Sequence, residues 1–85
     1  MIDYQITEYR YDWGTDIEAV DQEQDIIATC KISNEGQIMW FEKYKSEPKR
    51  FNKVYDELWA EAEREGLRLK KQMEIKNEFF KRQNN

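Results

Sequence analysis

The sequence predicts one small α+β domain, in which a three-stranded antiparallel sheet is followed by an amphipathic C-terminal helix in the order β-β-β-α. Three observations support this class: alternating apolar residues near the N-terminus, a hairpin pattern at residues 26–45, and an apolar stripe with helical spacing after residue 48. A length of 85 residues allows a single domain. We expect it to span residues 1–82, with a frayed tail at 83–85 and a possible helix break at Gly66.

Apolar and polar residues alternate at the N-terminus, which predicts a half-buried first strand. The apolar residues form two groups of opposite parity: Ile2, Tyr4 and Ile6, then Tyr9, Tyr11 and Trp13. Two interpretations remain open. A β-bulge near Thr7–Glu8 would bring both groups to one face, whereas a regular strand would place apolar groups on both faces.

The segment from Gly14 to Gln24 is acidic, and we interpret it as either a short helical turn or a loop. Thr15 and Glu18 have the spacing of a capping box, which favours the helical turn. The acidic side chains of this segment are Asp16, Glu18, Asp21 and Glu23, followed by Asp25. Calcium loops place a glycine within such a run of oxygen ligands, and this run has none inside it. We therefore expect no metal and no cofactor.

The central hairpin is the most distinct pattern in the chain. Ile26–Ser33 is rich in β-branched residues and predicts the second strand. The next three residues, Asn34-Glu35-Gly36, place a glycine where a three-residue hairpin turn requires positive φ. Residues 37–45 then predict the return strand.

The hairpin also predicts which side chains a single covering helix would leave uncovered. Met39 and Phe41 share one parity, and Trp40 has the other. We expect Met39 and Phe41 on the uncovered face, together with Ile27 and some of the N-terminal aromatic residues.

A helix is predicted from Pro48, because Ser46 can cap it and proline is tolerated in the first turn. Its apolar stripe consists of Phe51, Val54, Tyr55, Leu58, Trp59 and Ala62. Gly66 leaves alternatives open. It either ends the helix in the left-handed conformation or is a tolerated mid-helix glycine, with the stripe continuing through Leu69, Met73 and Phe80. Odd-numbered apolar residues from 67 to 79 also fit a strand.

Charge and composition bear on function. Residues 1–42 carry a net charge of −8 and residues 43–85 a net charge of +4, and such segregation concerns partners rather than fold. The chain has no histidine, so the usual general base and the commonest metal ligand are missing. No carboxylate has a recognisable catalytic partner, and we expect no enzyme activity.

The single cysteine, Cys30, cannot form an internal disulfide. It lies in an apolar stretch, so we interpret it as a small buried side chain. With no recognisable signal peptide or long apolar run, we expect a cytoplasmic protein that does not span a membrane.

These observations favour a non-catalytic protein-binding module, of the kind that phages or mobile elements use to inhibit a larger host or defence protein. The expected partner is a larger protein, and a basic surface on it would complement the acidic segment. The predicted contact residues are Asp16, Glu18, Asp21, Glu23, Met39 and Phe41. The alternative is a nucleic-acid-binding protein that uses Arg64, Arg68 and Lys71, which share one side of a helix. A homodimer through exposed aromatic surface is also compatible with the sequence.

Overall fold

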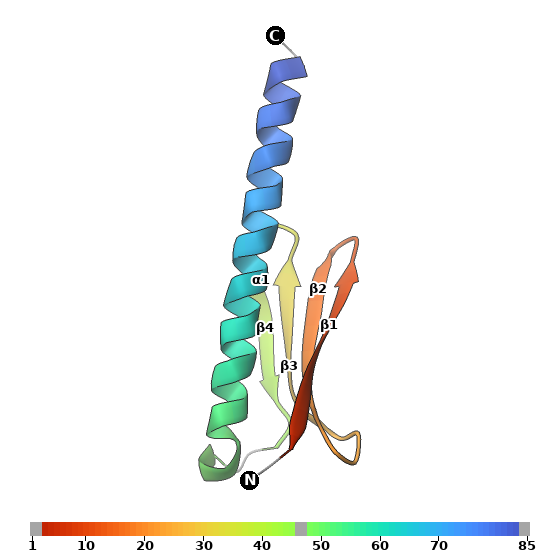
Figure 1. Cartoon of the computed structure of the whole chain (residues 1–85), viewed down its shortest axis with the longest axis vertical. Helices are drawn as coiled ribbons and strands as arrows, with labels where there is room; N and C mark the ends of the chain where they lie inside the picture. Colours follow the sequence, from red (N-terminus) through yellow and green to blue (C-terminus); the bar gives the residue numbers. More distant parts are fainter. Residues whose placement is uncertain (1–2, 46–47, 84–85) are drawn as a thin grey trace.

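The computed structural model describes residues 3–45 and 48–83. Within these residues, four strands form one antiparallel sheet in chain order, and one helix follows them (Figure 1). The elements are β1 (Tyr4–Tyr11), β2 (Gly14–Asp21), β3 (Ile26–Ser33), β4 (Ile38–Lys43) and α1 (Pro48–Gln83). The predicted α+β class and the order of sheet before helix are confirmed, whereas the predicted number of three strands is wrong.

The additional strand is β2, which the sequence presented as a helical turn or a loop. The two-residue turn Asp12–Trp13 joins it to β1, and Tyr11 pairs with Gly14 directly after this turn. Gly14 has a φ of 149°, and a Cβ atom there would lie 2.0 Å from a carbonyl oxygen of β3. Gly14 is therefore the first residue of β2 and not one of the two turn residues. The usual hairpin signature is absent for this reason.

The sheet contains two β-bulges, but neither is where the sequence suggested one. β1 pairs with β2 without a register shift, so the bulge considered near Thr7–Glu8 is absent. The extra residues are Ile27, opposite β2, and Met39, opposite β3. A bulge allows two successive side chains to lie on one face. Ile27 is accordingly fully buried beside Ala28, and the expectation that it faces outward was wrong.

The helix α1 runs through Gly66 without a break, so residues 67–79 form neither a second helix nor a strand. A Cβ atom on Gly66 would lie 2.7 Å from the carbonyl oxygen of Gly36 in the β3–β4 turn. The turn and the helix therefore approach each other through two glycines. Gly36 has a φ of 84°, which confirms the predicted three-residue turn. The helix begins at Pro48 as predicted, and Ser46, its expected cap, lies outside the described residues.

The core lies between one face of the sheet and the first two thirds of α1. The buried helix residues are Phe51, Val54, Tyr55, Leu58, Ala62 and Leu69, and they pack on Ile17, Ala19, Ile27, Ala28, Cys30 and Ile32 of the sheet. The predicted apolar stripe is confirmed except at Trp59, which is 44% exposed.

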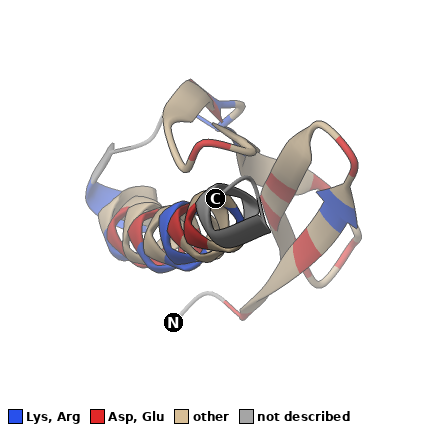
Figure 2. Ribbon diagram, turned by 90° about the horizontal axis from the view of Figure 1, so that it is seen from above, with Lys and Arg blue, Asp and Glu red and all other residues tan. Residues whose placement is uncertain are grey.

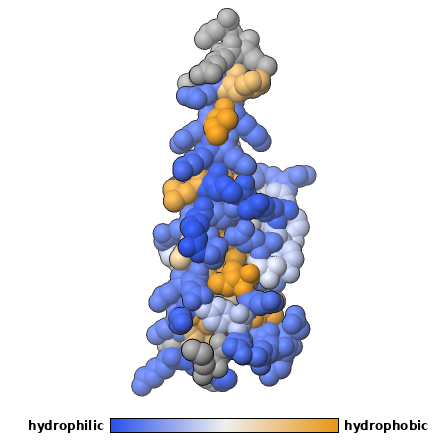
Figure 3. Space-filling view, in the orientation of Figure 1, coloured by the Kyte–Doolittle hydropathy of each residue, from blue (hydrophilic) through white to orange (hydrophobic). Residues whose placement is uncertain are grey.

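The C-terminal part of the helix extends beyond the sheet (Figure 1), and Leu69 is the last buried residue among those that the structure describes. We call residues 70–83 the projecting segment; at 1.5 Å per residue it is about 21 Å long. Every described side chain from residue 70 to residue 79 is exposed. Hydrophobic surface is nevertheless visible along this part of the helix (Figure 3). Gln83 is still helical. The side chains of residues 80–83 and the whole of residues 84–85 lie outside the described part of the chain.

Candidate functional site

The sheet has one covered face and one face that we call the open face. The helix α1 lies on one side of the sheet, as the view along the molecule shows (Figure 2). Successive side chains of a strand point to opposite faces. Thr15, Ile17 and Ala19 of β2 are buried beneath the helix. Asp16 and Glu18 therefore point away from the helix, onto the open face.

Two rows of side chains cross the open face from β1 to β4. The first row consists of Tyr9, Asp16, Lys31 and Trp40. The second row consists of Thr7, Glu18, Thr29 and Glu42. Directly opposed residues have Cβ atoms about 4.5–5.5 Å apart, so each row forms a continuous band of neighbouring side chains.

Aromatic side chains give the open face its apolar character. Tyr9, Tyr11, Trp13 and Trp40 are between 44% and 54% exposed. The rings of Tyr11 and Trp13 stack with centroids 5.2 Å apart, and Lys31 Nζ lies 5.7 Å from the Trp13 ring centre. With roughly 200 Å² per side chain, four half-exposed aromatics present about 400 Å². Asp16 and Lys31 separate Tyr9 from Trp40 in the first row, so this aromatic area is divided between the two edges of the sheet.

Carboxylates lie among these aromatic groups. Glu42 accepts a hydrogen bond from Trp40 Nε1 at 3.2 Å. Asp16 Oδ1 is buried and has no hydrogen-bond partner among the described residues. Together with Glu18, and with Lys31 as the single basic residue of the two rows, these carboxylates give the rows a net charge of −2. A face of this kind complements a partner surface that combines lysine or arginine with apolar groups.

The aromatic residues predicted from the sequence lie on both faces of the sheet. Met39 is 64% exposed at the bulge of β4. Phe41 was expected beside it on the uncovered face, and this was wrong: its ring packs against Trp59 of α1, with centroids 5.5 Å apart. The extra residue at Met39 changes the parity of β4, so Trp40 takes the place on the open face that Phe41 was expected to occupy.

The acidic residues predicted to bind a partner are also divided between two places. Asp16 and Glu18 belong to the open face, whereas Asp21 ends β2 and Glu23 lies in the turn that follows. The acidic segment is therefore not one loop, and only part of it can act together with the aromatic residues.

The β2–β3 turn brings together the carboxylates of Asp21, Glu23 and Asp25. Asp21 Oδ1 accepts hydrogen bonds from the backbone N–H groups of Glu23 at 3.0 Å and Asp25 at 2.9 Å. Its Oδ2 lies 2.7 Å from Lys45 Nζ, and this hydrogen bond lowers the pKa of Asp21. The lysine thus supplies positive charge at this turn, and these contacts give Asp21 a structural role.

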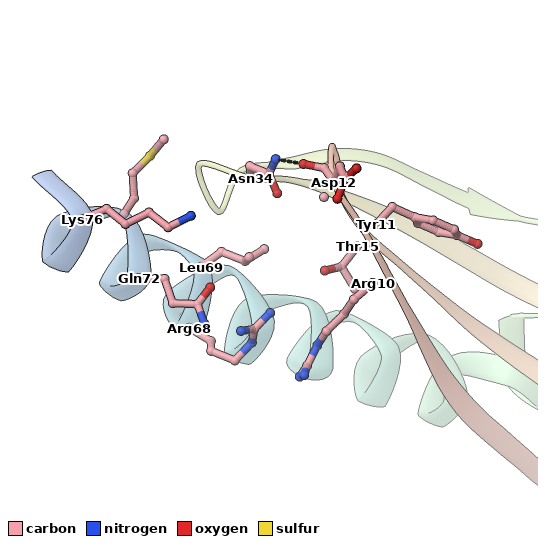
Figure 4. A pocket seen from close by; sticks show the side chains of 11 residues that line it. Arg10, Tyr11, Asp12, Thr15, Asn34, Arg68, Leu69, Gln72 and Lys76 are labelled. Atoms are coloured by element: carbon pink, nitrogen blue, oxygen red, sulfur yellow. Dashed lines mark hydrogen bonds between the residues drawn. The ribbon is translucent and has the colours of Figure 1, made fainter.

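A cavity of about 470 Å³ lies in the notch where α1 leaves the sheet (Figure 4). Figure 4 shows that side chains from the β1–β2 hairpin, the β3–β4 turn and α1 surround it. Its polar lining residues include Arg10, Asp12, Asn34, Arg68, Gln72 and Lys76.

Glu65 contacts three of the residues that line this cavity. Its carboxylate accepts hydrogen bonds from Thr15 Oγ1 at 2.7 Å, Arg10 Nε at 3.2 Å and an Arg68 terminal nitrogen at 2.9 Å. The hydrogen bond from Arg68, supported by the one from Thr15, outweighs burial and lowers the pKa of Glu65 to about 2. One buried carboxylate therefore neutralises much of the charge of two guanidinium groups, which weakens the cavity as an anion site.

The residues predicted for nucleic-acid binding lie on α1 as expected. Arg68 is bound to Glu65, and Arg64 forms an ion pair with Glu61 one turn earlier. Lys71 is exposed at the start of the projecting segment. Two of the three cations therefore already contact carboxylates within the chain.

Sequence reasoning missed three residues that define these sites. The alternation of side chains along the return strand placed Trp40 on the covered face, and Lys31 was not predicted as a contact residue. No local pattern marks Glu65, because two of its partners, Arg10 and Thr15, lie 55 and 50 residues away in the chain.

Comparison of the chain with protein-family models, with curated proteins and with solved structures gives no match. Over the described residues, no helix is both long enough and apolar enough to span a bilayer. The fold and the open face therefore define the class only as a small α+β domain with an uncovered, acidic and aromatic sheet face.

Proposed function

We propose that the chain is a non-catalytic protein-binding module that uses its open face to bind a basic surface on a larger protein. The observation that carries this proposal is the combination on one sheet face of half-exposed aromatic side chains with carboxylates. Tyrosine and tryptophan are enriched in the cores of protein interfaces, where they supply most of the binding energy.

The charge of the open face supports the choice of partner. Glu18 and Glu42 lie in one cross-strand row, and Asp16 lies in the next. These carboxylates would repel phosphate and attract lysine or arginine side chains, which also speeds the first encounter. The aromatic groups would then bury the apolar stems of those side chains.

Such a contact would act by steric blocking of the partner's surface. A small domain seated on a basic surface blocks whatever else that surface binds, which is how an inhibitor of a phage or mobile element would act on a host or defence protein. The absence of histidine from the sequence supports a non-catalytic role. A cytoplasmic location is part of this proposal, and the free, buried Cys30 is compatible with it.

A displayed library of random peptides, selected against the immobilised chain, supplies a probe for this surface. We expect selected peptides to combine lysine or arginine with aromatic or aliphatic residues. Their affinity should fall at least about tenfold for the double variant Glu18→Lys and Glu42→Lys, because charge attraction becomes repulsion. The matched control, Asp56→Lys with Glu63→Lys on the outer side of α1, makes the same charge change and should bind like the native chain. Equal binding to both double variants would refute the proposed contact.

The nucleic-acid alternative rests on the basic side of α1. Arg64 and Arg68 donate to Glu61 and Glu65, which reduces the charge that they offer to phosphate. A gel-shift assay at two salt concentrations tests this alternative, because phosphate binding must weaken steeply as salt rises.

A further inference from the structure

The projecting segment has the chemistry that the open face requires of a partner. Every described side chain in it is exposed, including Ile75 at 66% and Phe79 at 62%. Its fourteen residues carry five basic and two acidic side chains, a net charge of +3. It is therefore both basic and apolar, whereas the open face is acidic and aromatic.

We propose that the projecting segment of one copy of this chain docks on the open face of a second copy. The inference rests on the proposed function in one respect, since both use the open face as a binding surface. It adds that the chain itself carries a ligand for that surface, so that self-association and partner binding compete.

The spacing of the exposed residues supports this occupant. Lys71, Ile75 and Phe79 follow one another at intervals of four residues, which places them along one ridge of the helix. This ridge presents a cation and then two apolar side chains. On the open face, Trp40 hydrogen-bonds to Glu42, which sets a carboxylate beside an aromatic ring to receive such a ridge.

The dimensions of the two surfaces also agree. The projecting segment is about 21 Å long, and an eight-residue strand of the sheet spans about 26 Å. A helix lying along the strands would cover the open face as α1 covers the other one. The sheet would then be buried between two helical layers, one from its own chain and one from the neighbour, which is a common layer arrangement.

Charge selects this contact over the two symmetric alternatives. Two projecting segments would bring +3 against +3, and two open faces would bring −2 against −2. Only the pairing of a projecting segment with an open face brings opposite charges together. Each contact therefore joins unlike surfaces. A reciprocal pair would use the segment and the face of both copies, whereas a one-way pair would leave one segment and one face free, from which chains or rings can grow.

Sedimentation equilibrium at low ionic strength tests the proposal on the native chain. We expect an average mass that rises with concentration and returns to that of the monomer when salt screens the charges. A native chain that remains monomeric at low salt up to millimolar concentration would overturn the proposal.

Two charge-reversal variants identify the surfaces. The segment variant, Lys70→Glu with Lys71→Glu, and the face variant, Glu18→Lys with Glu42→Lys, should each remain monomeric. A matched control, Lys49→Glu with Lys53→Glu at the other end of α1, should associate like the native chain. Circular dichroism of each variant checks that it is folded. Lys70 and Lys71 are exposed, so their replacement should leave the core intact.

Mixing the two variants provides the decisive result. The segment variant keeps an intact face, and the face variant keeps an intact segment, so an equimolar mixture should associate although neither variant does so alone. A mixture that stays monomeric, or a single variant that still dimerises, would overturn the contact between segment and face. The segment variant also separates this inference from the proposed function: if the native chain does not self-associate while the segment variant still binds the selected peptides, self-docking fails and the binding role of the open face stands.

Discussion

Replacement of Glu65 by glutamine tests whether one buried carboxylate ties α1 to the β1–β2 hairpin. Glu65 is 4% exposed and receives hydrogen bonds from Thr15, Arg10 and Arg68. Glutamine has nearly the same shape but no charge, and its NH₂ group would face donors on at least one side. The substitution therefore removes the carboxylate partner of Arg68 and leaves Arg10 with its longer contact to Glu8, at 3.4 Å.

The magnitude follows from the pKa of Glu65. A fall of the pKa from the usual 4.5 to about 2 corresponds to about 3 kcal/mol of stabilisation by the ionised form. Because the folded-state pKa is depressed, this contribution is fully present above about pH 4.5 and is lost as the pH falls toward 2. The Glu65→Gln variant should thus be less stable by about 3 kcal/mol at pH 7, and the difference should shrink steadily below pH 4.5.

Urea unfolding followed by tryptophan fluorescence at pH 7, 4.5, 3 and 2 measures both effects. The matched control is Glu61→Gln, one turn earlier, which removes an exposed ion pair with Arg64 and should cost at most about 1 kcal/mol. A cost below about 1 kcal/mol for Glu65→Gln at pH 7, or a difference that does not change with pH, would refute this reasoning.

Two further substitutions and one labelling reaction test the packing between the sheet and α1. Gly66→Ala should destabilise the fold by about 1–2 kcal/mol in thermal unfolding, because its Cβ would meet the carbonyl oxygen of Gly36 at 2.7 Å and outweigh the gain in helix propensity; a stabilised variant would contradict this close approach. Phe41→Ala should cost about 2–3 kcal/mol through lost packing on Trp59, whereas a cost below about 0.5 kcal/mol would place Phe41 on the open face. Burial raises the pKa of the Cys30 thiol to about 11, so Ellman's reagent should label it only after unfolding, and rapid labelling of the folded chain would contradict its burial.

Local signals in the sequence were sufficient to predict the central hairpin and the start of the helix. The bounds of Ile26–Ser33, the turn at Gly36 and the helix start at Pro48 all follow from residue types within a few positions. β2 was not recognised, although Thr15, Ile17 and Ala19 alternate as a strand requires. Its outward positions are acidic, and such residues are equally frequent in loops, so only pairing with β1 and β3 reveals the strand.

The open face was harder to predict because the two bulges depend on contacts between strands. A count of alternating side chains along β4 assumes a regular strand. Because Met39 is an extra residue, this count assigns both Trp40 and Phe41 to the wrong face. The Glu65 cluster was inaccessible for a related reason, since Arg10 and Thr15 approach it only through the folded sheet. Charge segregation, by contrast, was visible from composition alone, and it is the part of the sequence analysis on which both proposals rely.

The affinity of the selected basic peptides for the Tyr11→Ser, Trp40→Ser double variant tests the central claim most directly. Both side chains are about half exposed on the open face, so their loss should leave the fold intact. Fluorescence anisotropy with labelled peptide gives the dissociation constants of the native and variant chains. The open face as binding surface predicts an affinity at least about tenfold weaker for the variant. An unchanged affinity in a folded variant would contradict the claim.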